Sequence, residues 1–385
     1  MNTKIIHLKA FSLNKNNSFP EKQDNQFYLA SWAGLIAKKI KNRHPKLDIE
    51  VWRAEPEFNH KTSRVINGIN ASIFPYKKPV IIKNVLTLKM LIQLRKLSKQ
   101  FNVIIHYHSL FGLFEVIIPH LIPRAKLILS HHGGLPPSEK TFGLKNNILN
   151  FLLKRSYNKI SFISYLNQQA KEYLESCYYN PLQKTFLPVG ADYDLMQPIE
   201  KRQARNLLDL DNSKVYAIYI GKLYSLKGVD IILDIYEKLS EKYNFSVLFI
   251  GDINSEEINI YNRIINSDCK YFGTQPHDKI NLYLSAADFY IHPVFNPVVG
   301  FDVSLIEAMA VGIPVVSTRL KITQIEYNKI GYQADSIKEF EEKTEQMILN
   351  FYNFSGIREF TKKYFDANSA IPDKYANWYN SIFKP

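Results

Sequence analysis

The 385-residue sequence is poor in cysteine and contains no long apolar run. Cys177 and Cys269 are its two cysteines, and they form no metal-spaced pair, which argues against a disulfide framework and against a zinc site. No stretch of about 18 uncharged apolar residues occurs, so no membrane-spanning helix is expected. The start, MNTKIIHLKAF, lacks the pattern of a signal peptide. These absences predict a reduced, cytoplasmic protein.

Positive charge is concentrated in the first half of the chain. Residues 1–192 contain 28 Lys and Arg against 11 Asp and Glu, whereas the remainder contains 21 against 25. A basic half of a protein can bind nucleic acid, an anionic membrane surface or a phosphorylated ligand. The sequence has no zinc-finger pattern, no RNP-type aromatic motif and no basic region with heptads, so nucleic acid is not expected as a partner.

Short apolar runs alternate with longer amphipathic segments in both halves. Strand-like runs include KIIHLKA, NVIIHYH and AKLILSHH in the first half, and VYAIYIG, FSVLFIGD and DFYIHPV in the second. Such alternation with helix-like segments is typical of parallel sheets covered on both faces. Because 46% of the residues are hydrophobic, two cores can form. The sequence therefore predicts an α/β protein with two doubly wound, Rossmann-like domains.

The domain boundary is expected just after LPVGADYDLMQP, where turn residues and prolines precede a short helix. This predicts an N-terminal domain at residues 1–195 and a C-terminal domain at 196–365. The aromatic, helix-compatible segment 366–385 should pack back on the N-terminal domain. Because doubly wound sheets bind ligands at the carboxyl ends of their strands, a cleft between the domains is the expected ligand site.

A strand-like run of the second half ends at Gly221 and is followed by Lys222, Lys227 and Gly228 before a helix. Two ammonium groups at a strand end, with glycines that let the backbone approach, indicate an anion site. Solvated surface lysines are the alternative. The Walker pattern GxxxxGK[ST] is absent, so this is not a P-loop.

Glu307 is an acidic residue in a stretch, 298–318, that reads mostly as core. Ser304 and Glu307 have the S-x-x-E spacing of a capping box, in which the serine caps a helix and the glutamate bonds back to the cap. Alternatively, the start of that helix presents free backbone N–H groups and a positive dipole end to a ligand. The pattern alone allows both interpretations.

Histidines follow two apolar strands of the first half. His108 ends IIHYH, and His131 and His132 follow AKLILS, at the strand ends where a doubly wound domain has its active site. His132 precedes Gly133 and Gly134, which permit close approach of the backbone. Structural histidines with satisfied hydrogen bonds are the alternative. No carboxylate or Cys cluster accompanies them, so no metal site is expected.

Five motifs taken in order resemble retaining glycosyltransferases of family 4, also described as glycosyl transferases group 1. They are HHGG at 131, LPVGAD at 187, IGKLYSLKGVD at 220, FGTQPHDKINLYLSAADFYIHPVF at 272 and GFDVSLIEAMAVGIPVVST at 300. The resemblance implies the GT-B fold, in which an acceptor-binding and a donor-binding Rossmann-like domain face each other across a cleft. It further implies sugar transfer, with retention of configuration, from a UDP or GDP sugar to a glycan or lipid-linked glycan. Cell-surface polysaccharide biosynthesis is the implied role, without a metal or other cofactor.

The resemblance also assigns roles to single residues. Lys222, which stands where the family usually has Arg, and Lys227 would bind the diphosphate, and Glu307 would bind the ribose hydroxyls. His132 would lie beside the transferred sugar and, with the two lysines, would be catalytic. The implied donor-binding set is Gly221, Lys222, Lys227, Gly300, Phe301, Asp302, Val303, Ser304 and Glu307. The implied acceptor or sugar set is His108, His131, His132, Gly133, Gly134 and Asn296.

Two positions depart from the family pattern, since Val299 replaces the first Glu of its E-x7-E motif and Asp302 replaces a glycine. The departures favour one alternative, a non-catalytic sugar-nucleotide-binding relative. A second alternative is a GT-B nucleotide-sugar epimerase or hydrolase, which would turn over donor without an acceptor. A basic and apolar segment, 142–159, predicts an amphipathic helix. Such a helix could lie on the anionic inner face of the membrane as a peripheral contact or pack on the core.

Overall fold

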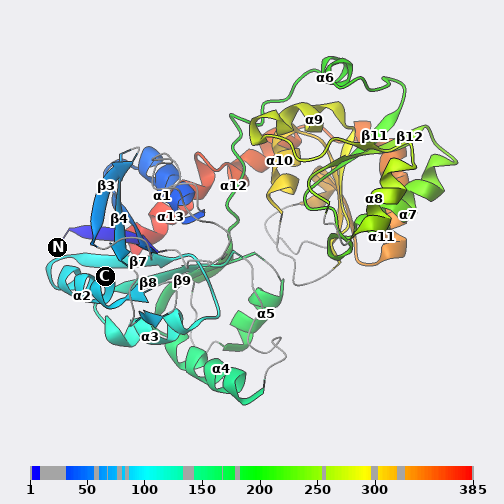
Figure 1. Ribbon diagram of the computed structural model, residues 1–385. Helices are drawn as coiled ribbons and strands as arrows, with labels where there is room; N and C mark the ends of the chain where they lie inside the picture. Colours follow the sequence, from blue (N-terminus) through cyan, green and yellow to red (C-terminus); the bar gives the residue numbers. More distant parts are fainter. Residues whose placement is uncertain are drawn as a thin grey trace. The chain divides into compact units, whose positions relative to one another are not determined.

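The computed structural model describes residues 2–8, 32–55, 60–66, 68–75, 80–82, 86–132, 143–166, 168–177, 183–253, 257–295, 302–318 and 326–383. The chain divides into two compact units, and each is described by itself. The N-terminal unit comprises residues 1–189 and 371–385, and the C-terminal unit comprises residues 190–370 (Figure 1). No helix in the described ranges is long and apolar enough to cross a bilayer.

An eight-stranded sheet forms the centre of the N-terminal unit, with the strand order β10-β9-β8-β7-β1-β2-β4-β3. Its neighbours are parallel except for β3, which is antiparallel to β4. The strands are β1 (Thr3–Leu8), β2 (Asp48–Glu55), β3 (Thr62–Ile66), β4 (Ile69–Pro75), β7 (Asn102–Tyr107), β8 (Lys126–Ser130), β9 (Ile160–Tyr165) and β10 (Gln183–Phe186). A separate antiparallel pair consists of β5 (Val80–Ile82) and β6 (Leu86–Thr87).

Within the described residues, the helices of this unit are α1 (Trp32–Arg43), α2 (Leu88–Gln100), α3 (Leu113–Leu121), α4 (Gly143–Tyr157), α5 (Gln168–Cys177) and α13 (Ala370–Ser381). The strands at the centre of the sheet are apolar on both faces because helices cover both sides, and Ile104 and Ile105 are both fully buried. Strands β2 and β7 lie on opposite sides of β1. The carboxyl ends of β1 and β7 are therefore the switch point at which such sheets bind ligands.

A six-stranded parallel sheet forms the centre of the C-terminal unit, with the order β13-β12-β11-β14-β15-β16. Its strands are β11 (Val215–Ile220), β12 (Phe245–Ile250), β13 (Lys270–Tyr271), β14 (Phe289–His292), β15 (Val315–Thr318) and β16 (Gly331–Ala334). The helices are α6 (Lys201–Leu207), α7 (Val229–Ser240), α8 (Ile258–Ile265), α9 (Ile280–Ala286), α10 (Val303–Val311), α11 (Ile337–Asn350) and α12 (Ile357–Phe365). Here the switch point lies between β11 and β14.

The last helix, α13, belongs to the core of the N-terminal unit. Its apolar and aromatic residues Ile371, Tyr375 and Tyr379 join the cluster that contains Ile5 of β1 and Ile40 of α1. In Figure 1 the helix, in red, lies beside α1. An amphipathic aromatic segment needs an apolar partner, and the sheet supplies it.

The unit boundaries differ by a few residues from the predicted limits at 195 and 366. Residues 190–195 and 366–370 belong to the C-terminal unit. They are the two segments in which the chain passes from one unit to the other, and they pair with each other. Ala191 forms a parallel bridge with Asp366, and the hydroxyl of Tyr193 donates to Thr361 at 2.8 Å. Turn chemistry in the sequence marks where a strand ends, but such long-range pairing decides which core a linker joins.

Candidate functional site

Lys227 lies at the switch point of the C-terminal unit. Strand β11 ends at Ile220, and a short 3-10 helix, η3 (Ser225–Lys227), leads into α7. The Nζ atom of Lys227 donates to both carboxylate oxygens of Asp302 at 2.6 and 2.7 Å. Lys222 lies on the same loop, and its side chain is exposed. The structure therefore brings Lys227 into contact with Asp302, the residue that precedes α10.

Gly228 sets how closely the lysine loop approaches β14. Its backbone has φ 75°, and a Cβ at this position would lie 2.2 Å from the carbonyl oxygen of Pro293. A residue with a side chain would be strained by the left-handed backbone and would clash with that carbonyl. Glycine thus permits the 3-10 turn to pack directly against the end of the neighbouring strand.

Asp302 is the N-terminal cap residue of α10, but its side chain makes no capping hydrogen bond. It accepts instead from Lys227 and from Nε2 of the fully buried His292, 3.1 Å away. Burial alone would raise the pKa of Asp302, but the hydrogen bond and charge of His292, together with Lys227, outweigh it and lower the pKa to about 2. The carboxylate is therefore ionised at neutral pH and offsets the charge of Lys227.

The capping-box interpretation of Ser304 is wrong. The helix begins at Val303, so Ser304 is already inside it. Its hydroxyl donates to the carbonyl of Ile220 at 2.9 Å and lies 2.8 Å from the hydroxyl of Tyr290. Ser304 thereby ties the start of α10 to the end of β11, a role that depends on tertiary contact rather than on local spacing.

Glu307 is buried in α10 and bonds to a loop residue rather than back to the cap. Nε2 of His277, in the 3-10 helix η4 (His277–Lys279), lies 2.6 Å from Oε1 of Glu307, so the ring donates to the carboxylate. The His277 side chain is 62% exposed, whereas that of Glu307 is 6% exposed. A polar ligand could therefore reach the carboxylate by displacing an exposed imidazole.

Several predicted site residues lie outside the described ranges. They are Gly133, Gly134, Asn296, Gly300 and Phe301, together with the variant position Val299. Among the described donor residues, Gly221 and Val303 are half-buried next to Lys222 and Ser304. The assignments of these residues stay predictions.

The N-terminal unit brings two of its three predicted histidines together. Nδ1 of His108 lies 3.0 Å from Nε2 of His132, and the rings are stacked with centroids 5.3 Å apart. His131 is fully buried and makes an edge contact with Phe111 at 5.6 Å. Successive residues of an extended chain point to opposite faces, so the adjacent His131 and His132 do not act as one pair.

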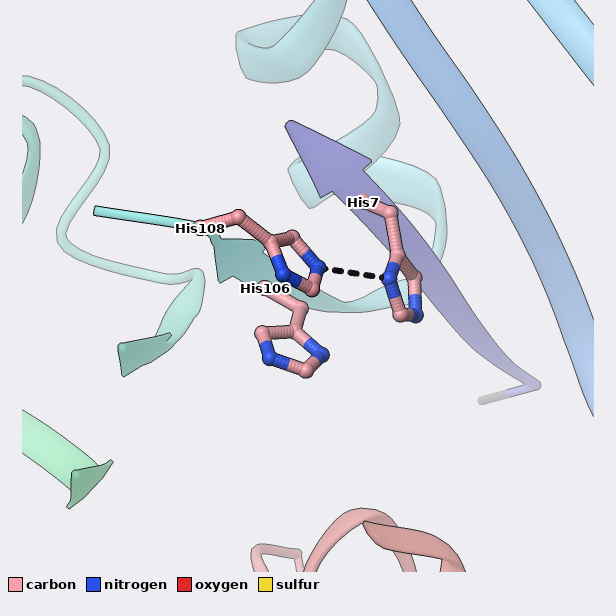
Figure 2. Close-up of side chains that lie close together, drawn as sticks. All are labelled: His7, His106 and His108. Carbon is pink, nitrogen blue, oxygen red and sulfur yellow. Dashed lines mark hydrogen bonds between the residues drawn. The ribbon is translucent and has the colours of Figure 1, made fainter. Parts of the chain in front are cut away.

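Two further histidines complete this cluster, His7 from the run KIIHLKA and His106 from IIHYH, and neither was among the predicted site residues. Nδ1 of His7 lies 2.9 Å from Nε2 of His108, and His7 is the direct register partner of His106 on β7 (Figure 2). One nitrogen from each of His7, His106 and His108 lies within 4.8 Å of the others. Aligning KIIHL with NVIIHY as neighbouring strands would have revealed the pair. Spacing along the chain cannot detect such groupings.

Comparison with solved structures decides the fold. The Anabaena protein HepE, solved in complex with UDP, superposes with a TM-score of 0.68 over 99% of this chain and 100% of its own, at 15% sequence identity. The chain has the GT-B fold. Both doubly wound units described above are the Rossmann-like halves of GT-B, and the predicted fold class is confirmed.

The match to a family model lies in the C-terminal half of the chain. Residues 214–350 match the family described as Glycosyl transferases group 1. The Erwinia amylovora amylovoran biosynthesis glycosyltransferase AmsK is 27% identical over 138 residues, 33% of this chain and 34% of its own. TuaC of Bacillus subtilis, which carries the name of a teichuronic acid biosynthesis glycosyltransferase, is 25% identical over 43% of this chain and 40% of its own. The chain thus spans about two fifths or less of these relatives.

Proposed function

We propose that the protein is a retaining glycosyltransferase that moves a sugar from a UDP or GDP sugar to a glycan or a lipid-linked glycan. The observation that carries this proposal is the contact of Lys227 with Asp302 at the start of α10, with Lys222 on the same loop, at the switch point of the C-terminal unit. This grouping lies in the part of the chain that matches Glycosyl transferases group 1. The UDP bound to HepE supports a nucleotide donor, and the names of AmsK and TuaC support polysaccharide assembly.

The chemistry follows from charge development at the leaving group. Breaking the anomeric C–O bond leaves negative charge on the nucleoside diphosphate and positive charge on the sugar ring. The two lysines and the backbone N–H groups at the start of α10 supply preorganised positive potential for the leaving diphosphate. Glu307 supplies a buried acceptor for ribose hydroxyls once His277 moves aside. The proposed mechanism therefore needs no metal ion.

The Lys227–Asp302 pair favours a second candidate, a non-catalytic relative that binds sugar nucleotides. An ionised carboxylate beside the diphosphate lysine weakens the positive potential on which leaving-group stabilisation depends. These two candidates and the epimerase or hydrolase alternative differ in turnover. A transferase consumes donor only when an acceptor is supplied, a GT-B epimerase or hydrolase consumes donor alone, and a binding relative consumes none.

A panel of nucleoside diphosphates and their sugars, screened by thermal shift and then assayed for turnover with glycan acceptors, tests the proposal. UDP or GDP should raise the melting temperature. Glu307→Ala should weaken that binding, and Lys222→Ala with Lys227→Ala should abolish turnover. Lys238→Ala, a matched change on the exposed face of α7, should do neither. If no nucleoside diphosphate bound, both the transferase and the binding relative would be excluded.

Helix α4 supports a peripheral membrane contact for this enzyme. The predicted segment forms a helix at Gly143–Tyr157, and on one side of it Leu153 and Tyr157 are completely buried. On the other side Leu144, Ile148 and Phe151 are 77%, 54% and 60% exposed. These positions are spaced at i, i+4 and i+7, so they form one stripe. An exposed apolar stripe with basic neighbours fits an anionic membrane surface.

The contact can be tested with vesicles. The full-length protein should bind phosphatidylglycerol-containing vesicles more strongly than pure phosphatidylcholine vesicles. Ile148→Ser with Phe151→Ser should weaken binding about tenfold or more, because each buried side chain contributes about 1.5–3 kcal/mol. Ile258→Ser, an equally exposed position on α8, is the control and should leave binding unchanged. Equal binding by all three proteins would contradict the proposal.

A further inference from the structure

A cluster of imidazoles lies at the switch point of the N-terminal unit. His7 and His106 are register partners on β1 and β7, and His108 follows His106 by two residues, so the three rings share one face of the sheet (Figure 2). Ring centroids lie 4.5 Å apart for His7 and His106 and 4.2 Å apart for His106 and His108. His7 and His106 are fully buried, so water cannot satisfy their nitrogens.

One hydrogen-bonded chain connects the cluster to helix α13 on one side and to the predicted catalytic histidine on the other. It runs in the order His132, His108, His7, Tyr379, His106 and Ser130. Its links measure 3.0, 2.9, 3.1, 2.6 and 2.7 Å between the bonded nitrogen and oxygen atoms. Ser130 continues the chain to Tyr375, 2.9 Å away on α13.

A metal ion is the rival explanation for three clustered histidines. Neutral imidazoles are good ligands for zinc, and one nitrogen of each ring lies within 4.8 Å of the other two. Both nitrogens of His7, of His106 and of His108 already have a hydrogen-bond partner in the chain just described. A metal would have to displace several of these bonds. The hydrogen-bonded chain satisfies both ring nitrogens of His7, His106 and His108 without one.

His7, Tyr379 and His106 each carry one proton for two hydrogen bonds. Burial lowers the pKa of His7 to about 3, and burial with the nearby His7 and His132 lowers the pKa of His106 well below its ordinary value. Burial raises the pKa of Tyr379 well above 10. These groups are therefore neutral near pH 7. A neutral imidazole has one donor and one acceptor nitrogen. The nitrogen that carries the proton in one ring therefore determines which nitrogen carries it in the next ring.

The two contacts of Tyr379 set the direction of the chain. An O–H···N bond is usually shorter than an N–H···O bond, so the hydroxyl donates to Nδ1 of His106 at 2.6 Å and accepts from Nε2 of His7 at 3.1 Å. Nδ1 of His7 must then accept from Nε2 of His108. With His108 neutral as well, its Nδ1 must in turn accept from Nε2 of His132.

We propose that Tyr379, acting through His7 and His108, holds neutral His132 in the tautomer that is protonated at Nε2. No covalent bond forms or breaks, and every proton stays within the chain. The nitrogen of His132 that carries no proton is then Nδ1, and its ring is oriented by the bond to His108. Tyr379, His7 and His108 are positioning residues for His132. The consequence for catalysis rests on the proposed function, whereas the proton order does not.

Nitrogen-15 NMR of full-length protein with labelled histidine tests the order directly. Two-bond proton–nitrogen correlations at neutral pH should show His132 protonated at Nε2, with its signals assigned from a His132→Gln variant. In Tyr379→Phe, Nε2–H of His7 would lose its acceptor, and a buried unsatisfied donor is costly. His7 and His108 should then donate through Nδ1, and the proton of His132 should move to Nδ1.

Tyr193→Phe is the matched control. It removes a buried hydroxyl that donates a 2.8 Å hydrogen bond to Thr361 in the C-terminal unit, so it should leave the His132 signals unchanged. The proposal is overturned if His132 carries its proton at Nδ1 in the unaltered protein, or if Tyr379→Phe leaves its tautomer unchanged. The spectrum of the unaltered protein decides the matter even if Tyr379→Phe does not fold. Stoichiometric Zn²⁺ binding with loss of the inner ring N–H signals would also overturn it.

Turnover separates this proposal from the proposed function. With active enzyme, Tyr379→Phe should lower kcat about tenfold or more and leave KM for the donor unchanged, because it alters a proton position rather than donor contacts. Unchanged kcat would show that the tautomer of His132 has no catalytic effect, which would overturn the positioning role. If the unaltered protein transferred no sugar while its spectra followed the expected order, the transferase would be refuted and the proton order supported.

Discussion

Replacing Asp302 by Asn should tighten nucleoside diphosphate binding rather than weaken it. The Asp302 carboxylate holds Lys227 through bonds of 2.6 and 2.7 Å, and it is ionised at neutral pH. A phosphate bound to the same ammonium would lie about 4 Å from this carboxylate and be repelled by it. Asn is nearly isosteric with Asp but carries no charge, so the substitution removes the repulsion and frees the lysine from its ion pair.

The magnitude follows from the partial burial of the pair, whose side chains are 14% and 27% exposed. Two unit charges about 4 Å apart interact by about 1 kcal/mol in water and about 4 kcal/mol at an effective dielectric constant of about 20. We expect about 2 kcal/mol for this partly buried site, which is roughly a thirtyfold lower Kd. The effect should shrink at high salt because ions screen the partly exposed carboxylate.

Isothermal titration calorimetry with UDP and GDP measures the effect. Asp234→Asn is the matched control, because it removes the same charge from the same unit at a carboxylate that pairs with Arg263. Equal Kd values for Asp302→Asn, Asp234→Asn and the unaltered protein would refute the competition between Asp302 and the diphosphate. Weaker binding by Asp302→Asn alone would instead show that this carboxylate contributes to holding the ligand.

Three further outcomes follow from the C-terminal unit. Folding lowers the pKa of Asp302 from 3.8 to about 2, so this carboxylate stabilises the unit above pH 3.8 and the stabilisation is lost as pH falls towards 2. In an acid titration followed by circular dichroism, the free energy of unfolding should fall by about 2 kcal/mol more for the unaltered protein than for Asp302→Asn. Gly228→Ala should destabilise the unit by about 2 kcal/mol or more in urea unfolding, because φ 75° and the 2.2 Å approach to Pro293 exclude a side chain. A free energy of unfolding within error of the unaltered protein would contradict the close approach of this turn to Pro293. Ser304→Ala should cost about 1 kcal/mol by leaving the Ile220 carbonyl without its serine donor. An unchanged or higher stability, which the better helix propensity of alanine alone would give, would argue against that tether.

Local patterns were sufficient for the elements and for part of the site. Apolar runs of strand length separated by amphipathic segments predicted two doubly wound sheets, because burial on both faces leaves few polar positions in a central strand. Lys227 was identified for a similar reason, since a strand end followed by glycine and a helix start has one geometry in such folds. The S-x-x-E spacing at Ser304 was misleading, because helix α10 begins at Val303 and leaves Ser304 within its first turn.

The partners of these residues could not be predicted from spacing. Lys227 and Asp302 are 75 residues apart, and His277 lies 30 residues before Glu307. His277 and His292 both occur inside motifs singled out in the sequence, yet nothing in the letters says what their rings face. Hydrogen bonding acts over about 3 Å in space, whatever the distance along the chain.

By itself the sequence determined the two Rossmann-like units, the basic character of the first half and the candidate residues at strand ends. Each of these three features depends on the periodicity or composition of neighbouring residues, so it can be recognised in the sequence alone. Only the tertiary structure decided that Asp302 offsets Lys227, and that Tyr379 and His7, 372 residues apart, belong to one hydrogen-bonded chain with His132. These pairings arise when parallel strands align in register and a distant helix closes over them, so the polar atoms meet only after the core has formed.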